Sequence, residues 1–189
     1  MIIVDLGCGS KETKVTPQVL EKVSGIKVEN STIVGVDLSS ETEYNVDLEK
    51  GKLPFRNESV DMFYSSHTFE HLYDIEHIMR EIYRCIRPDG LLVVRVPHYS
   101  APNAKTPFHK LYYSYNNSFA HYIPKVIAKK HTEHYSHVRF NYVKRRLRFG
   151  RFFRFYAEPL FNLFPLFYER YLSGIFPCDE LLFVMKPVK

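Results

Sequence analysis

The chain has 189 residues, of which 45% are apolar, which is enough to bury one hydrophobic core in a single domain. The 26 basic and 21 acidic side chains interrupt every apolar run, so no run approaches the length of roughly twenty uncharged residues that a helix needs to cross a bilayer. The three cysteines (Cys8, Cys85 and Cys178) form no C-x-x-C pair, which disfavours a disulfide framework and indicates reduced thiols in a cytoplasmic protein. Because the first residues enter a strand directly, we expect no signal peptide.

The first predicted strand covers residues 2–6 and runs into Gly7 and Gly9, spaced as G-x-G. Glycine has no Cβ, so such a turn lets a ligand lie directly on the backbone at the carboxyl end of a parallel strand. A dinucleotide site needs a third glycine where this chain has Glu12, and no P-loop pattern occurs. The loop therefore indicates either a nucleotide-like ligand other than NAD or only a tight turn.

Further strands are predicted over residues 32–36, 44–48, 60–64 and 91–96. Asp37 ends the second strand, where a carboxylate can accept hydrogen bonds from both hydroxyls of a ribose. One helix is predicted after the fourth strand, with Asp74 as N-cap, residues 88–90 as its end and an apolar face of Ile75, Ile78, Met79, Ile82, Tyr83 and Ile86. Strands that alternate with helices predict an α/β fold. We expect a doubly wound, mostly parallel Rossmann-like sheet in a three-layer sandwich.

The segments DLGCG, VGVDLS, NVDL, LPFRNESVDMFYSSHTFEHL and EIYRCIRPDGLLVVRVP occur in this order. The series resembles the small type 11 kind of class I S-adenosylmethionine-dependent methyltransferases over roughly the first half of the chain. The resemblance implies S-adenosylmethionine as cofactor, and it implies a role for each matching residue. Asp5, Gly7 and Gly9 would lie under the methionine part, Asp37 and Leu38 at the ribose, Asp47 and Leu48 at the adenine, and Ser65, Ser66 and His67 beside the sulfonium.

Two features depart from the pattern of that family. Lys11 stands where a third glycine is common, and no helix precedes the first strand to help close the cofactor pocket. We expect one methyltransferase domain over residues 1–189, with a cofactor-binding half at 1–97 and an acceptor insertion with closing strands at 98–189.

The predicted acceptor segment covers about residues 98–134. The sequence around His109 partly resembles a D-P-T-H-x-R-x-F-S segment of predicted methyltransferases from surface-polysaccharide gene clusters, with Thr106 and Phe108 as departures. Residues 167–177 and 179–185 resemble the end of the same group, and the latter run is expected to form a final, antiparallel edge strand. The resemblance implies O-methylation of a glycan, a lipid-linked sugar or a related small molecule.

Methyl transfer to a hydroxyl needs alignment and a base, for which histidine is suited near neutral pH. The candidates are His67, His98 and His109, and a purely structural role remains open for each. Glu70 and His71 are expected to fix the turn into the next helix. The spacing of His131, His134 and His137 could suggest metal, but the ligand set is incomplete and we expect no metal site.

Charge separates the two halves of the chain. Residues 1–100 hold 11 Lys and Arg against 16 Asp and Glu, whereas residues 101–189 hold 15 against 5. The basic stretch from Arg139 to Arg154, together with the next residue, Phe155, also contains six aromatic residues. It predicts a strand with a solvated basic edge followed by a core helix, or a surface for an anionic acceptor, an anionic membrane or RNA.

Nucleic acid is the disfavoured partner, because the D/N-P-P-Y/F and Pro-Cys patterns of base methyltransferases are absent from the fourth strand. Two alternative functions stay open. One is an RNA methyltransferase that uses the basic half, and the other is a non-catalytic scaffold that binds S-adenosylmethionine.

Overall fold

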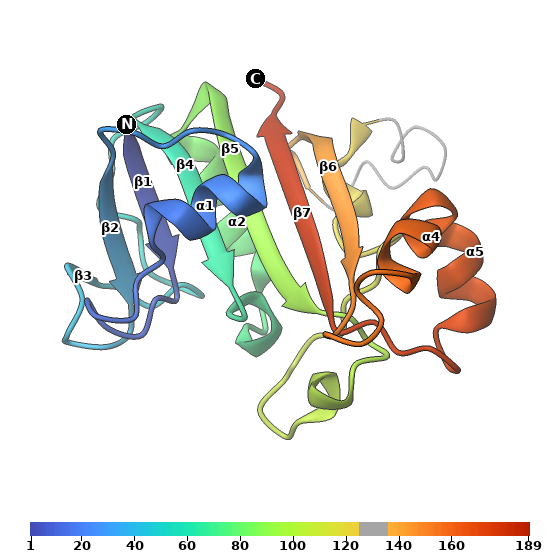
Figure 1. Ribbon diagram of the computed structural model, residues 1–189. Helices are drawn as coiled ribbons and strands as arrows, with labels where there is room; N and C mark the ends of the chain where they lie inside the picture. The colour runs from blue at the N-terminus through green and yellow to red at the C-terminus, as the bar shows by residue number, and fades with distance from the viewer. Residues whose placement is uncertain (125–135) are drawn as a thin grey trace.

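Seven strands form one sheet in the order β3-β2-β1-β4-β5-β7-β6 in the computed structural model, which describes residues 1–124 and 136–189 (Figure 1). The strands are β1 (Ile2–Leu6), β2 (Thr32–Asp37), β3 (Tyr44–Asn45), β4 (Val60–Ser66), β5 (Ile86–Pro97), β6 (Phe140–Arg148) and β7 (Glu180–Pro187). Strands β1 to β5 are parallel to one another, and β7 runs antiparallel to both of its neighbours. The predicted doubly wound, mostly parallel sheet is confirmed.

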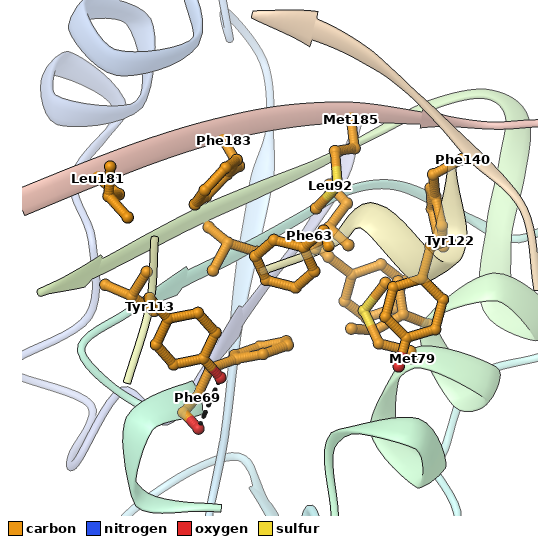
Figure 2. Packing of buried hydrophobic residues seen from close by; sticks show 14 of the residues in the cluster. Phe63, Phe69, Met79, Leu92, Tyr113, Tyr122, Phe140, Leu181, Phe183 and Met185 are labelled. Atoms are coloured by element: carbon orange, nitrogen blue, oxygen red, sulfur yellow. Dashed lines mark hydrogen bonds between the residues drawn. The ribbon is translucent and has the colours of Figure 1, made fainter. Parts of the chain in front are cut away.

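Helices pack on both faces of the sheet. Helix α1 (Pro17–Ser24) lies on one face and α2 (Ile75–Cys85) on the other (Figure 1). On the α2 side, Phe63, Leu92 and Phe183 from three neighbouring strands belong to one buried cluster (Figure 2). The other helices and helical turns of the described residues are η1 (Phe69–His71), η2 (Pro102–Lys105), η3 (Ala120–Tyr122), α4 (Ala157–Leu163), α5 (Pro165–Phe167) and η4 (Tyr168–Leu172).

Helix α2 begins as the sequence predicts. The Asp74 carboxylate accepts hydrogen bonds from the N–H groups of Glu76 and His77, which satisfies two of the free donors of the first turn. The helix ends three residues before the predicted stop, at Cys85, because Ile86 is already extended and pairs with β4. Arg87 precedes a proline, which disfavours helical backbone, so β5 starts at Ile86 and not at Leu91.

The last strand in sequence is not the edge strand that we predicted. Strand β7 lies between β5 and β6, and β6 forms the edge (Figure 1). Residues 180–185 are all buried, as an interior strand requires, whereas β6 buries only Phe140 and Leu147. Strand β6 also carries Lys144, Arg145, Arg146 and Arg148, and such charges blunt an exposed edge. Two further predictions need correction, since β3 has only two residues and α4 buries only Ala157 and Phe161, so it is no core helix.

Candidate cofactor and acceptor site

The loop after β1 adopts the backbone that its glycines permit. Gly7 and Gly9 have φ angles of 73° and 76°, in the left-handed region that L side chains rarely adopt. A Cβ on Gly7 would lie 2.1 Å from Oγ1 of Thr68, so a side chain from beyond β4 occupies the space that glycine leaves. The loop is therefore closely packed against the end of β4.

Asp37 holds this loop at the tip of β2. One carboxylate oxygen accepts from the Gly9 N–H at 2.9 Å, and the other accepts from the Ser39 N–H at 3.0 Å. The side chain stays half-exposed, so lone pairs of both oxygens remain available to a ligand. The structure thus places the predicted ribose-binding carboxylate directly beside the glycine loop.

A cavity of about 210 Å³ opens next to Asp37. Its lining residues are Gly7, Asp37, Leu38, Asp47, Leu48, Glu49, Thr68, His71 and Leu72. Five of the predicted cofactor residues therefore meet in one space, where Leu48 offers a buried apolar wall and Leu38 an exposed one. The Asp47 carboxylate accepts from the Glu49 N–H at 2.9 Å, which orients it at the rim. We name this space the adenosine-side cavity.

A second cavity, of about 370 Å³, lies on the other side of Gly7, which lines both. Its lining includes the charged side chains of Asp5, Lys14 and Arg95 and the hydroxyl groups of Thr13, Thr16, Tyr64 and Ser66. Burial raises the pKa of Asp5 to about 6, although the Val15 N–H donates to this carboxylate at 2.7 Å. A cationic ligand group beside Asp5 would relieve that burial penalty.

Five predicted site residues line neither cavity (Gly9, Ser65, His67, His98 and His109), and two of the five, Ser65 and His98, are fully buried. Ser65 is fully buried and donates to the carbonyl of Leu6, so its hydroxyl faces the core and not the sulfonium position. His98 is fully buried as well, with its ring nitrogens 2.7 Å from Oγ of Ser100 and 3.3 Å from Glu169. This enclosure favours the structural role that the sequence left open for His98.

His67 lies between two carboxylates at the end of β4. Its ring nitrogens are 3.2 Å from Glu70 and 3.3 Å from Glu180, and these hydrogen bonds raise the pKa of His67 to about 9. The imidazole is thus a cation at neutral pH, which already holds the proton that a base would have to accept. Glu180 also pairs with Arg95 at 2.6 Å and with Arg148 at 3.7 Å.

His109 is half-buried in the segment after β5. Its ring lies edge-to-face against that of His71, with centroids 4.8 Å apart. His71 lines the adenosine-side cavity, so His109 is the predicted histidine that best combines an accessible ring with a place beside the cofactor residues. Of the three histidines whose spacing could suggest metal, His131 and His134 lie outside the described residues and His137 is exposed.

The strand order, the glycine loop and the acids at the tips of β2 and β3 define a class I S-adenosylmethionine-dependent methyltransferase fold. A family described as "Methyltransferase domain" matches residues 4–94, which therefore form a class I methyltransferase domain whose cofactor is S-adenosylmethionine. The chain is 27% identical over 96 residues to trans-aconitate 2-methyltransferase of Deinococcus radiodurans. That match covers 50% of this chain and 37% of the relative.

Solved structures share the fold along the whole chain. A putative methyltransferase of Haloferax volcanii, in complex with the Trm112 methyltransferase activator, superposes with a TM-score of 0.58 at 17% identity over 100% of this chain and 83% of that one. An S-adenosylmethionine-dependent methyltransferase of Mesorhizobium loti superposes with a TM-score of 0.53 at 16% identity, over 97% of this chain and 89% of that one. At these identities the likeness concerns the fold.

Sequence reasoning missed the acids that organise the second half of the site. Glu169 holds His98 and accepts from the backbone N–H groups of Tyr115 and Asn116, and Glu180 joins His67 to Arg95. Both are among only five acids in the basic half. The rarity of acidic residues in a strongly basic segment could have identified Glu169 and Glu180 as candidates from the sequence.

Proposed function

We propose that this protein transfers the methyl group of S-adenosylmethionine to a hydroxyl oxygen of a glycan, a lipid-linked sugar or a related small molecule. The observation that carries the proposal is the meeting of Gly7, Asp37 and Asp47 at one cavity, with Asp5 and Ser66 across the glycine loop. In this proposal the adenosine part occupies the first cavity, and the methionine part extends past Gly7 so that its ammonium group approaches Asp5.

The transfer itself requires little from the protein. The acceptor oxygen forms a bond to the methyl carbon while the C–S bond breaks, and the electron pair of that bond converts the sulfonium into a neutral thioether. The hydroxyl proton must leave, so positioning and proton removal are the tasks of the protein. Of the predicted histidines, His109 has the accessible position for this task, because His98 is enclosed and His67 is already protonated.

A basic groove supports an anionic acceptor. The groove has a volume of about 510 Å³ and is lined by the cationic side chains of Lys22, Lys144, Arg146, Arg148 and Arg154. Its Arg148 pairs with Glu180, which in turn pairs with Arg95 of the second cavity. A phosphate in the groove would thus lie on the side of the sheet that carries the methionine side of the proposed cofactor site.

An exposed aromatic patch beside the groove supports a lipid-linked form of that acceptor. The patch consists of Phe152, Phe153, Phe155, Tyr156, Leu163 and Phe164. Phe152 is 92% exposed and Phe155, at 77%, also lines the groove. Large exposed apolar patches mark contacts with membranes or partners, and flanking arginines favour anionic lipid. No helix in the described parts of the chain is long and apolar enough to cross a membrane.

The test has two steps. Calorimetry should show binding of S-adenosylmethionine and its demethylated product but not of NAD, and label from the methyl group should appear in a polysaccharide or lipid-linked fraction. His109→Ala should lower label transfer without changing cofactor affinity. The control His137→Ala, at an exposed histidine, should change neither label transfer nor cofactor affinity. Binding of cofactor without label in any acceptor fraction would leave the non-catalytic scaffold as the function.

The RNA alternative uses the same charges and is separated by salt. The affinity for RNA falls as the salt concentration rises, and the slope of the log–log plot is close to the number of phosphates contacted. Sedimentation with anionic vesicles, and titration with RNA over the same salt series, therefore distinguish the two partners. Tight, salt-sensitive binding of RNA with no affinity for anionic vesicles would replace the glycan or lipid acceptor with RNA.

A further inference from the structure

Three potential metal ligands meet between η1 and the segment after β5. Glu70 and His71 are adjacent in η1, and His109 comes from the acceptor segment. One ligand atom of each of the three side chains lies within 4.8 Å of the other two. Burial decreases across the group, from buried Glu70 to half-buried His109 and exposed His71, so one side of the cluster is open to solvent.

Both histidines are oriented in the manner of metal ligands. Nδ1 of His71 lies 3.2 Å from the carbonyl of Phe108, and Nδ1 of His109 lies 3.1 Å from the carbonyl of Ala104. A carbonyl only accepts, so each Nδ1 carries the proton and each Nε2 keeps its lone pair. Hydrogen bonds of this kind fix the tautomer and the ring orientation of histidines that bind metals.

Glu70 supplies an independent observation. The side chain is fully buried, and its Oε1 lies 3.2 Å from Nδ1 of His67. Its Oε2 is buried and has no hydrogen-bond partner among the described residues. A buried carboxylate oxygen without a partner is costly, and a cation is the ligand that removes the cost.

We propose that Glu70, His71 and His109 bind a divalent transition-metal ion of the zinc class at the rim of the adenosine-side cavity. Two imidazoles and one carboxylate form a common catalytic zinc set, and imidazole suits Zn²⁺, Fe²⁺ or Co²⁺, whereas Mg²⁺ prefers oxygen ligands. Three protein ligands leave coordination positions for water or for an acceptor hydroxyl.

The location gives the ion a role in the proposed methyl transfer, and this part of the inference rests on the proposed function. His71 lines the cavity that also contains Asp37 and Asp47. An ion held by these three residues would act as a Lewis acid that lowers the pKa of an acceptor hydroxyl, and so would ease the proton removal that the methyl transfer requires. His109 would then act as a ligand rather than as the base.

The test measures metal binding without cofactor or acceptor. The purified, metal-free chain is titrated with Zn²⁺ by calorimetry and with Co²⁺ by visible absorption, and Mg²⁺ serves as the negative arm. Variants are Glu70→Gln, His71→Ala and His109→Ala. His77→Ala is the matched control, because His77 is half-buried on α2 and bonds the Gly51 carbonyl outside the cluster. Circular dichroism of each apo variant reports on folding, and exposed His71 gives a variant that leaves the core intact.

We expect one Zn²⁺ per chain, with affinity lowered about tenfold or more in each ligand variant and unchanged in His77→Ala. The Co²⁺ absorption bands should disappear in the same three variants. Absence of saturable Zn²⁺ binding, preference for Mg²⁺, or equal Zn²⁺ affinity in folded His71→Ala and wild type would overturn the proposal. Failure of methyl transfer with intact metal binding would instead count against the proposed function alone.

Discussion

The acidic half at residues 1–97, where we propose that the cofactor binds, and the basic half at residues 98–189, where we propose that the acceptor binds, hold their candidate groups in different ways. In residues 1–97 the functional groups lie at strand tips, and backbone hydrogen bonds orient them, as the Gly9 and Val15 N–H groups orient Asp37 and Asp5. In residues 98–189, ion pairs between distant side chains join the backbone hydrogen bonds, and the pair of Glu180 with Arg95 is an example.

This difference has a consequence for how each half tolerates change. A strand-tip site depends on the conformation of a few residues, so one substitution in the glycine loop should damage it severely. A site held by exposed charges and aromatic rings depends on the sum of many weak contributions, so single substitutions should matter less.

Among the residues of the two proposed binding sites, the largest effect on stability is expected at Gly7. Gly7→Ala should lower the free energy of unfolding by about 2–4 kcal/mol, because the new Cβ meets Thr68 while the backbone has a positive φ. Gly174→Ala is the control in the other half, since no heavy atom lies within 4 Å of its Cβ position. The free energy of unfolding of Gly174→Ala should stay within about 1 kcal/mol of the wild-type value. Urea unfolding of both proteins measures the difference, and similar losses would contradict the contrast.

Asp37 should dominate cofactor affinity. Asp37→Ala removes a charged acceptor for the ribose hydroxyls, a loss of about 1.5–3 kcal/mol, or roughly 10- to 100-fold in the dissociation constant of S-adenosylmethionine. Because Asp37 also accepts from Gly9, Asp37→Asn separates positioning of the loop from charge. Calorimetry measures the affinity, with Asp89→Ala as an exposed control. If Asp37→Ala binds S-adenosylmethionine as tightly as wild type, Asp37 does not contact the cofactor.

The Asp5 carboxylate should lower the stability of the folded protein at neutral pH and strengthen the binding of S-adenosylmethionine. Its pKa of about 6 is raised from 3.8, so ionisation is harder in the folded protein, and stability falls as pH rises from about 4 to 6 and stays lower above it. Asp5→Asn should therefore be more stable than wild type by about 1–2 kcal/mol at pH 7.5, with the difference shrinking towards pH 4. The same variant should bind S-adenosylmethionine more weakly. Urea unfolding across this pH range tests the sign, and a wild type that is more stable at neutral pH would contradict it.

The smallest stability effect is expected in the aromatic patch. Phe152→Ser with Phe155→Ser should change the free energy of unfolding by no more than about 0.5 kcal/mol, because both rings are exposed. Phe149→Ser, a buried neighbour, should cost about 3 kcal/mol or more. Sedimentation with anionic vesicles should nevertheless weaken in the double variant. If vesicle binding is unchanged, the patch is not the membrane contact.

The first half of the fold could be predicted because its signals are local. Gly7 and Gly9, the acid after each short strand and the Asp74 cap specify turns, tips and a helix start within a few residues. Periodicity located most strands for the same reason. It could not place β7, because the apolar run at 181–185 is compatible with an edge or an interior strand until its neighbours are known.

The sequence by itself thus determined the class of fold, the cofactor loop and the acids beside it, since these follow from short-range backbone chemistry and a collinear series of motifs. Only the tertiary structure decided which histidines can act. Burial encloses His98, two carboxylates hold a proton on His67, and the segment after β5 brings His109 to Glu70 and His71. Each outcome includes a contact between residues 38 to 113 positions apart, because such burial and charge pairing arise when distant segments pack together.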